Sequence, residues 1–139
     1  MKRTLLIALI ALALVAAACG GGDDDGTLRL EVSDSPLGEI LTTSTGDTLY
    51  LFVPDAQSDA TCYGECAGNW PPLTAEIGTG SGVDDDLLGS VARDDAGIQV
   101  TYNGWPLYYF GGDSGAGDAN GQGVNDVWFV VDAAGDAIQ

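Results

Sequence analysis

The sequence Thr48-Leu49-Tyr50-Leu51-Phe52-Val53-Pro54-Asp55 returns 58 residues later as Pro106-Leu107-Tyr108-Tyr109-Phe110-Gly111-Gly112-Asp113. Both copies follow the pattern Gly-x-x-Leu-Tyr-x-Phe-x-x-Asp, and a tryptophan follows after 14 further residues. At the same ungapped offset Trp70 aligns with Trp128, Gly46 with Gly104, and Ile40 with Ile98. Self-similarity at a fixed offset indicates duplicated structural units. Because there are only two copies, we predict a small single domain of two pseudo-symmetric β-hairpin repeats, about residues 38–73 and 96–131.

Apolar runs and turn signals predict strands in both repeats. Ile98–Tyr102 and Trp105–Phe110 flank Asn103-Gly104, which is the two-residue signature of a tight hairpin. The counterpart in the first repeat is Glu39–Thr43 followed by Thr48–Phe52. We also expect an edge strand at Leu28–Val32, a strand at Val127–Val131 and one short helical turn within Asp84–Ser90. The predicted class is all-β.

The start of the chain has the three parts of a secretory signal peptide. Lys2 and Arg3 precede an apolar run of about 14 residues, whereas a helix needs roughly 20 residues to cross a bilayer. The run ends in Val15-Ala16-Ala17-Ala18-Cys19, which is similar to a lipobox and predicts cleavage after residue 18 and acylation of Cys19. The alternative is an ordinary signal peptide that leaves Cys19 as a free thiol.

The segment after the cleavage site is typical of a tether. Residues 19–27 are rich in glycine and aspartate, a composition that keeps a linker flexible and solvated, and the β domain follows at 28–139. Two or more acyl chains hold a protein stably at a membrane. We therefore expect an exported protein, anchored in the bilayer through Cys19 at the cell membrane or envelope and facing away from the cytoplasm.

The composition disfavours several classes of function. Removal of residues 1–18 leaves Arg29 and Arg93 against 21 acidic residues, a net charge of −19, with no His, Lys or Met. Without His, a chain cannot form Ser-His or Cys-His nucleophiles or the usual zinc sites. So acidic a surface also disfavours binding to nucleic acid. We expect a non-enzymatic protein with no nucleic-acid partner, although a hydrolase that uses two carboxylates stays open.

Cys62 and Cys66 are the two cysteines left after Cys19. In an exported chain an even pair of this kind favours a structural disulfide. The alternative is a redox or metal-binding dithiol, although Cys-x-x-x-Cys is not the redox spacing and no second ligand pair accompanies it.

The chain resembles the family of predicted lipoproteins called "secreted repeat of unknown function", which carries a Tyr-x-aromatic-x-x-Asp motif. The resemblance covers roughly residues 38–132 and is carried by residues 46–52, by Cys-x-x-x-Cys-Ala-x-x-Trp-Pro-Pro-Leu at 62–73, and by residues 99–110. Gly117-Asp118, Gly121-Gln122-Gly123 and Trp128 complete it. It departs from the family at Thr43, where Asp is frequent, and at Ala116, where Pro is frequent. The resemblance implies an exported domain of two repeats and supplies no activity.

Six aromatic residues are candidates for a binding surface. Residues two apart lie on the same face of a strand, so each repeat presents a Tyr and a Phe together. These rings either form the core of a small domain or line an aromatic groove of the kind that binds sugars or peptides. The six residues are Tyr50, Phe52, Trp70, Tyr108, Phe110 and Trp128.

Acidic residues at the strand ends are weak candidates for a metal site. Asp55 and Asp113 close the two motifs, where Asp commonly caps a turn by accepting backbone N–H bonds. Residues 113–123, which include Asp118 and Asn120, are rich in oxygen donors that suit calcium. An EF-hand loop starting at Asp118 fails, because its twelfth position is Phe129 instead of Glu.

We therefore expect a membrane-anchored binding or structural module of the cell envelope that acts on an unknown envelope ligand or protein and needs no cofactor. The alternative is a small redox or calcium-type metal-binding protein that uses Cys62 and Cys66 or the Asp-rich loops.

Overall fold

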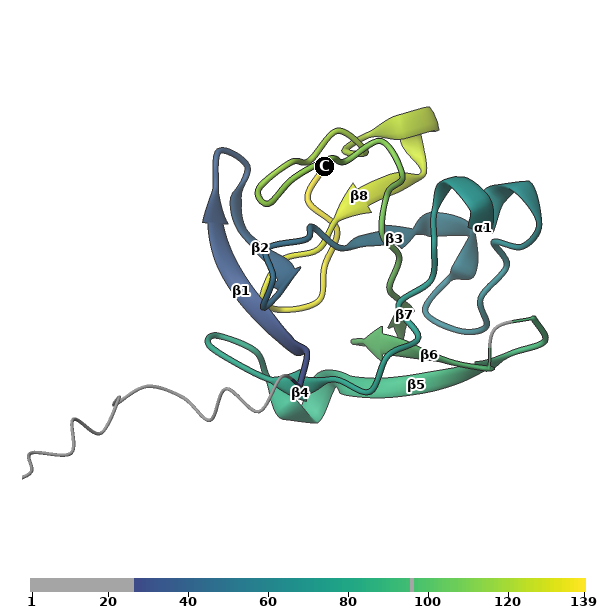
Figure 1. The fold of residues 1–139 in the computed structure, drawn as a ribbon, viewed down its shortest axis with the longest axis horizontal. Helices are drawn as coiled ribbons and strands as arrows, with labels where there is room; N and C mark the ends of the chain where they lie inside the picture. Colours follow the sequence, from purple (N-terminus) through teal and green to yellow (C-terminus); the bar gives the residue numbers. More distant parts are fainter. Residues whose placement is uncertain (1–26, 96) are drawn as a thin grey trace, which may run out of the picture.

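The computed structural model describes residues 27–95 and 97–139. The predicted signal peptide, Cys19 and the tether up to residue 26 lie outside these residues. The predicted all-β class is confirmed, because most of the regular structure consists of strands and the longest helix has only five residues. In chain order (Figure 1) the elements are β1 Arg29–Ser35, β2 Gly38–Thr43, β3 Tyr50–Phe52, the 3-10 turn Val53–Asp55, α1 Glu65–Asn69, β4 Gly78–Thr79, the 3-10 turn Asp85–Leu87, β5 Leu88–Arg93, β6 Gly97–Tyr102, β7 Trp105–Pro106, the 3-10 turn Val124–Asp126 and β8 Trp128–Val130.

Each half contains one long antiparallel hairpin. In the pairing of β1 with β2, Leu30 lies opposite Thr43 at one end and Ser35 opposite Gly38 at the other. In the pairing of β5 with β6, Leu88 lies opposite Tyr102 and Arg93 opposite Gly97. The sheets have the orders β2-β1-β4 and β5-β6-β7, with β3 and β8 forming a third pair. In Figure 1, β1 runs along the left side and β5 along the bottom, and β3 and β8 lie within this corner.

A pseudo-twofold relation between the repeats is centred on Tyr50 and Tyr108. Their backbones exchange both N–H···O bonds, at 2.9 and 3.0 Å. Equivalent bonds surround this pair: Leu41 N to Val131 O matches Val100 N to Leu73 O, both at 2.8 Å, and Val53 N to Val127 O (2.9 Å) matches Gly111 N to Asn69 O (2.7 Å). Every one of these bonds joins one repeat to the other. The two repeats are therefore intertwined in a single domain.

The core has two parts that follow from this arrangement. One is mainly aliphatic and takes Leu49 and Leu107 from the two motifs together with the inner faces of the hairpins. The other is mainly aromatic and contains Tyr50, Tyr108 and Cys62. Because adjacent strand residues point to opposite faces, the Leu-Tyr pair of each motif contributes one side chain to each part.

Two predicted hairpins are shorter than expected. The segment Thr48–Phe52 pairs with β2 only through one bridge, between Thr48 and Thr42. Its main partner is β8 of the other repeat. The strand predicted at Trp105–Phe110 ends at Pro106 as β7, although the tight turn at Asn103-Gly104 forms as predicted, with φ of 51° and 79°. In both cases the chain leaves its local partner because the motif tyrosines pair with each other.

Two further expectations are wrong in detail, and one is confirmed. Leu28–Val32 is not an edge strand, because β1 lies between β2 and β4. Ile98 is 56% exposed, and Gln99 takes the buried place that corresponds to Ile40, since the loop after β2 is one residue longer than its counterpart. The short helical turn expected within Asp84–Ser90 is confirmed at Asp85–Leu87, directly before β5, and the one α-helix of the described residues is α1.

Candidate functional site

The six aromatic residues pack on one another, and of the six only Phe110 also lines the surface hollow described below. Trp70 and Trp128, which are equivalent in the two repeats, stack with centroids 3.8 Å apart and an interplanar angle of 1°. Phe52 stacks on Trp128 at 4.3 Å, and Phe110 stacks on Trp70 at 4.2 Å. Both tryptophans are buried, at 6% and 3% exposure. The four rings form a column across the pseudo-twofold relation, so they belong to the core.

The tyrosine and aspartate of the motif bond across the repeats. Tyr50 donates its hydroxyl proton to Asp113 at 2.7 Å, and Tyr108 donates to Asp55 at 2.8 Å. The second oxygen of each carboxylate accepts a backbone N–H from its own loop, Thr61 for Asp55 (2.8 Å) and Asn120 for Asp113 (2.9 Å). Each aspartate thus fastens its own loop to the other repeat. This explains why the motif contains both residue types.

Burial sets the ionisation of these groups. It raises the pKa of Tyr50 and of Tyr108 far above the usual range, and the acceptor carboxylates raise them further. Burial also raises the pKa of Asp55, against the hydrogen bonds from Thr61 and Tyr108 that lower it. The tyrosines therefore act as neutral donors.

The weak metal candidates are engaged in hydrogen bonds with the protein. Asp118 accepts from Ser114 N (2.9 Å) and Gly115 N (3.0 Å), and these bonds lower its pKa. The Asn120 side chain donates to Gly112 O at 3.2 Å. Among residues 27–95 and 97–139, no three His, Cys, Asp or Glu side chains are grouped so that they could hold a metal ion. Asp55 and Asp113 accept backbone N–H bonds, as the capping role predicts, and each also accepts a tyrosine hydroxyl from the other repeat.

Cys62 and Cys66 form a disulfide, as predicted. Cys62 is buried beside the aromatic column, and Cys66 lies on α1. The carbonyl of Cys62 accepts a 2.7 Å bond from the buried Arg93 guanidinium, which also pairs with Asp95 and lies 4.4 Å from the Tyr63 ring centroid. The bridge and the arginine together fix the loop that precedes α1.

Removing the bridge is expected to lower stability without unfolding the domain. The disulfide closes a ring of about five residues, and on the chain-entropy model the Cys62→Ala/Cys66→Ala variant should lose about 2 kcal/mol of unfolding free energy. Urea denaturation of the variant beside the oxidised protein measures this loss. An unchanged midpoint would show that the bridge does not stabilise the fold.

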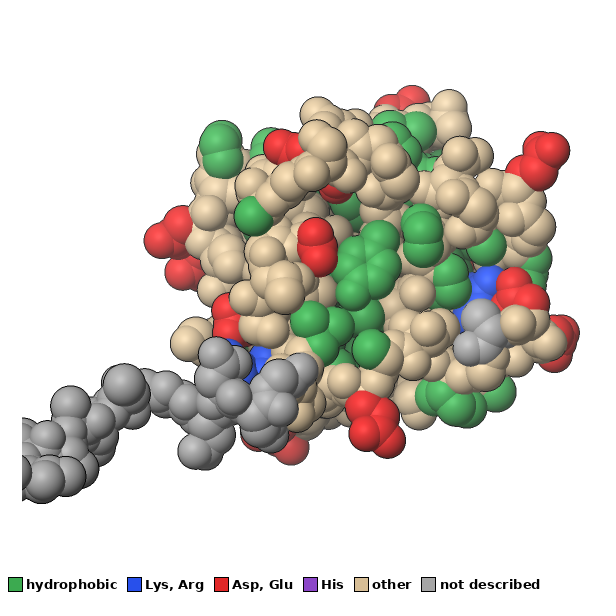
Figure 2. All heavy atoms as spheres, in the orientation of Figure 1, with side chains coloured by type: hydrophobic (Ala, Val, Ile, Leu, Met, Phe, Trp, Pro, Cys, Tyr) green, Lys and Arg blue, Asp and Glu red, His purple; other side chains and the backbone are tan. Residues whose placement is uncertain are grey.

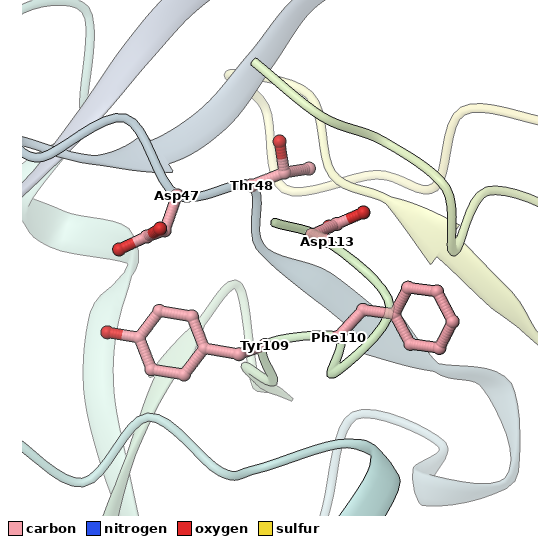
Figure 3. A pocket seen from close by; sticks show the side chains of 5 residues that line it. All are labelled: Asp47, Thr48, Tyr109, Phe110 and Asp113. Atoms are coloured by element: carbon pink, nitrogen blue, oxygen red, sulfur yellow. The ribbon is translucent and has the colours of Figure 1, made fainter. Parts of the chain in front are cut away.

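A surface hollow lies beside the motif of the second repeat. It has a volume of about 310 Å³ and is lined by Asp47, Thr48, Tyr109, Phe110 and Asp113 (Figure 3). Figure 2 shows hydrophobic side chains gathered near the middle of one face, with acidic side chains around them. The size is at the lower end of small-ligand pockets, and the lining combines two aromatic rings, two hydroxyls (Thr48 and Tyr109) and two carboxylates.

Hydrogen bonds hold the first of the two carboxylates in place. Asp47 Oδ2 accepts from the hydroxyl of Thr45 at 3.0 Å, and its backbone N–H donates to the Thr43 hydroxyl at 3.2 Å. Tyr109 is partly buried, and burial, followed by the charge of Asp47, raises the pKa of its hydroxyl. The hollow is therefore negatively charged and is lined in part by aromatic side chains.

Sequence reasoning named Phe110 and Asp113 but missed Asp47, Thr48 and Tyr109. The search for repeats selected positions at which the copies agree. The three missed residues are positions at which they differ, with Trp105, Pro106 and Leu51 as counterparts. That difference was the signal that could have found them.

The fold defines a class of protein: a small, duplicated all-β domain whose repeats are joined by backbone hydrogen bonds and which contains a disulfide. The chain belongs to the family described as "secreted repeat of unknown function", whose model matches residues 31–74 and 89–132. These two ranges begin within β1 and within β5, so each repeat includes the first strand of its long hairpin. No curated protein and no solved structure matches the chain. None of the helices in the described part of the chain has the length and apolar character needed to span a bilayer.

Proposed function

We propose that this exported protein is a lipid-anchored, non-enzymatic binding module of the cell envelope. Acylated Cys19 would hold it in the bilayer, and the tether would carry the β domain away from the surface. The observation that carries the binding role is the hollow, whose lining offers aromatic rings, hydroxyls and carboxylates for a ligand. The mature chain has no His or Lys that could activate a nucleophile, which supports a role in binding over one in catalysis.

A rigid frame around the hollow also supports binding. Asp113 is fixed by Tyr50 and by Asn120, and Phe110 is fixed by its stack on Trp70. A ligand that enters such a site loses less free energy to ordering the protein. We expect no resident cofactor, since the oxygens of Asp55, Asp113 and Asp118 accept hydrogen bonds from the protein.

Anchoring is tested by fractionation of the native host. The wild-type protein should sediment with membranes, and Cys19→Ala should appear in the soluble exported fraction, because one thioether-linked lipid is the proposed attachment. Mass spectrometry of the purified wild-type protein should show a chain that begins at residue 19 and carries acyl chains. The Cys62→Ala/Cys66→Ala variant is the matched control and should stay with the membranes. An unmodified Cys19, or a chain that begins at Met1, would contradict the proposal.

A further inference from the structure

The two repeats differ where the hollow opens. The shared positions of its lining, Phe110 and Asp113, have Phe52 and Asp55 as counterparts and take part in the contacts that build the fold. The pseudo-symmetric counterparts of the other three positions are Trp105 and Pro106 in the second repeat and Leu51 in the first. Leu51 is completely buried, whereas Tyr109 stays partly open. Asp47, Thr48 and Tyr109 therefore distinguish the hollow from the pseudo-symmetric counterpart positions.

The hollow concentrates negative charge with no opposite charge beside it. Asp47 and Asp113 both line it, and neither has an ion-pair partner among the described residues. The two arginines of the described chain are paired elsewhere, Arg29 with Glu31 and Arg93 with Asp95. In Figure 3 the Asp47 carboxylate lies on the same side as the Tyr109 hydroxyl, and Asp113 lies between Thr48 and Phe110. The net charge of −17 over the whole chain adds a long-range field that attracts cations.

We propose that the hollow lined by Asp47, Thr48, Tyr109, Phe110 and Asp113 binds an organic ammonium group. The carboxylates of Asp47 and Asp113 neutralise its charge, and the exposed parts of the Tyr109 and Phe110 side chains receive its alkyl groups through cation–π and apolar contact. This inference names the ligand class of the binding module proposed above and rests on that role.

Other ligand classes fit the lining less well. A hard metal ion such as Ca²⁺ takes six to eight oxygen ligands, whereas the side chains that line this hollow supply two carboxylates and two hydroxyls. The Thr48 hydroxyl already donates to Asp118 O at 2.5 Å. A neutral sugar would leave both carboxylate charges without compensation. An organic cation satisfies the carboxylates and the rings together.

The proposal is tested by titration of the mature lipoprotein in a neutral maltoside detergent. The probes are choline, as a free quaternary ion, and Nα-acetyl-lysine amide, as a peptide side chain, so that the two sources of ammonium are distinguished. We expect saturable binding of at least one probe, with NMR shifts confined to residues around the hollow. Asp47→Asn and Tyr109→Leu should each weaken binding about threefold, and the double variant about tenfold. Leucine is the residue that the first repeat carries at this position, so Tyr109→Leu retains a residue compatible with the repeat.

Three controls make the result decisive. Asp34→Asn removes an exposed charge away from the lining and should leave affinity unchanged. The neutral isostere of choline, 3,3-dimethylbutan-1-ol, should bind at least tenfold more weakly, and added NaCl should weaken choline binding. Equal binding of the isostere, undiminished binding by the folded double variant, or binding of glucose but of neither cation would overturn the proposal. Membrane attachment through Cys19 is measured separately, so the anchoring proposal can stand or fall on its own.

Discussion

Trp128→Ala is expected to lower the free energy of unfolding by about 3–5 kcal/mol, the cost of truncating a large buried aromatic side chain. Trp128 is 3% exposed and contacts three rings: Trp70 at 3.8 Å, Phe52 at 4.3 Å and Tyr108 at 5.1 Å between centroids. Small domains are stable by only about 5–15 kcal/mol, so this loss is a large share of the total. Chemical denaturation followed by tryptophan fluorescence and circular dichroism measures it.

The repeats supply matched controls for this experiment. Trp70→Ala should cost a similar amount, because it removes the equivalent ring of the same stacked pair. The double variant should cost less than the two single losses added together, since both remove the Trp70–Trp128 contact. Trp105→Ala, which removes a partly buried ring packed on the aliphatic core, should cost clearly less. A loss below about 1.5 kcal/mol for Trp128→Ala would contradict the assignment of this column as core, because truncations in a packed core cost more.

The duplicated motif predicted the fold class and the pseudo-symmetry, because spacing along the chain reports which residues share a strand face. It could not report which repeat supplies the partner of each residue. Tyr50 bonds Asp113, and Tyr108 bonds Asp55, although each tyrosine has an aspartate five positions away in its own copy. The local hairpin signals around Thr48 and Trp105 are overridden by the same exchange. Long-range pairing is settled by packing of the whole domain.

The partner predicted for β2 is also wrong, because β2 pairs with β1 and meets Thr48–Phe52 only at one bridge. The tight turn at Pro36-Leu37 joins β1 to β2, and the Ser35 hydroxyl supports it by accepting from Leu37 N at 3.1 Å. This turn lacks the Asn-Gly signature that identifies the β6–β7 connection, and the alternating pattern of residues 28–32, which predicts an edge strand, does not report that β4 also pairs with β1. Ile98 was misplaced because an ungapped offset ignores the extra residue after β2. The hollow was missed because it is made where the repeats diverge.

Alkaline unfolding is expected to depend on the two motif tyrosines. Tyr50 and Tyr108 are completely buried, and burial together with their aspartate acceptors raises the pKa of each in the folded state. In the unfolded chain a tyrosine ionises near pH 10. Because the folded pKa is the higher one, the stabilisation is fully present below pH 10 and is lost as the pH rises toward the folded pKa. Above pH 10 each tyrosine should cost about 1.4 kcal/mol per pH unit, and the two together about 3 kcal/mol per unit.

Urea denaturation at intervals between pH 9 and 11.5, with phenolate absorbance recorded in parallel, measures this slope. Tyr108→Phe removes one of the two ionising groups and should reduce the slope by nearly half, although it lowers stability at neutral pH by leaving Asp55 without its donor. Tyr50→Phe should behave in the same way through Asp113. If neither variant changes the slope, the loss of stability at high pH comes from general charge repulsion on this acidic chain. A reduced slope in both variants, with phenolate forming only as the protein unfolds, would show that the neutral hydroxyl–carboxylate pairs between the repeats stabilise the folded state.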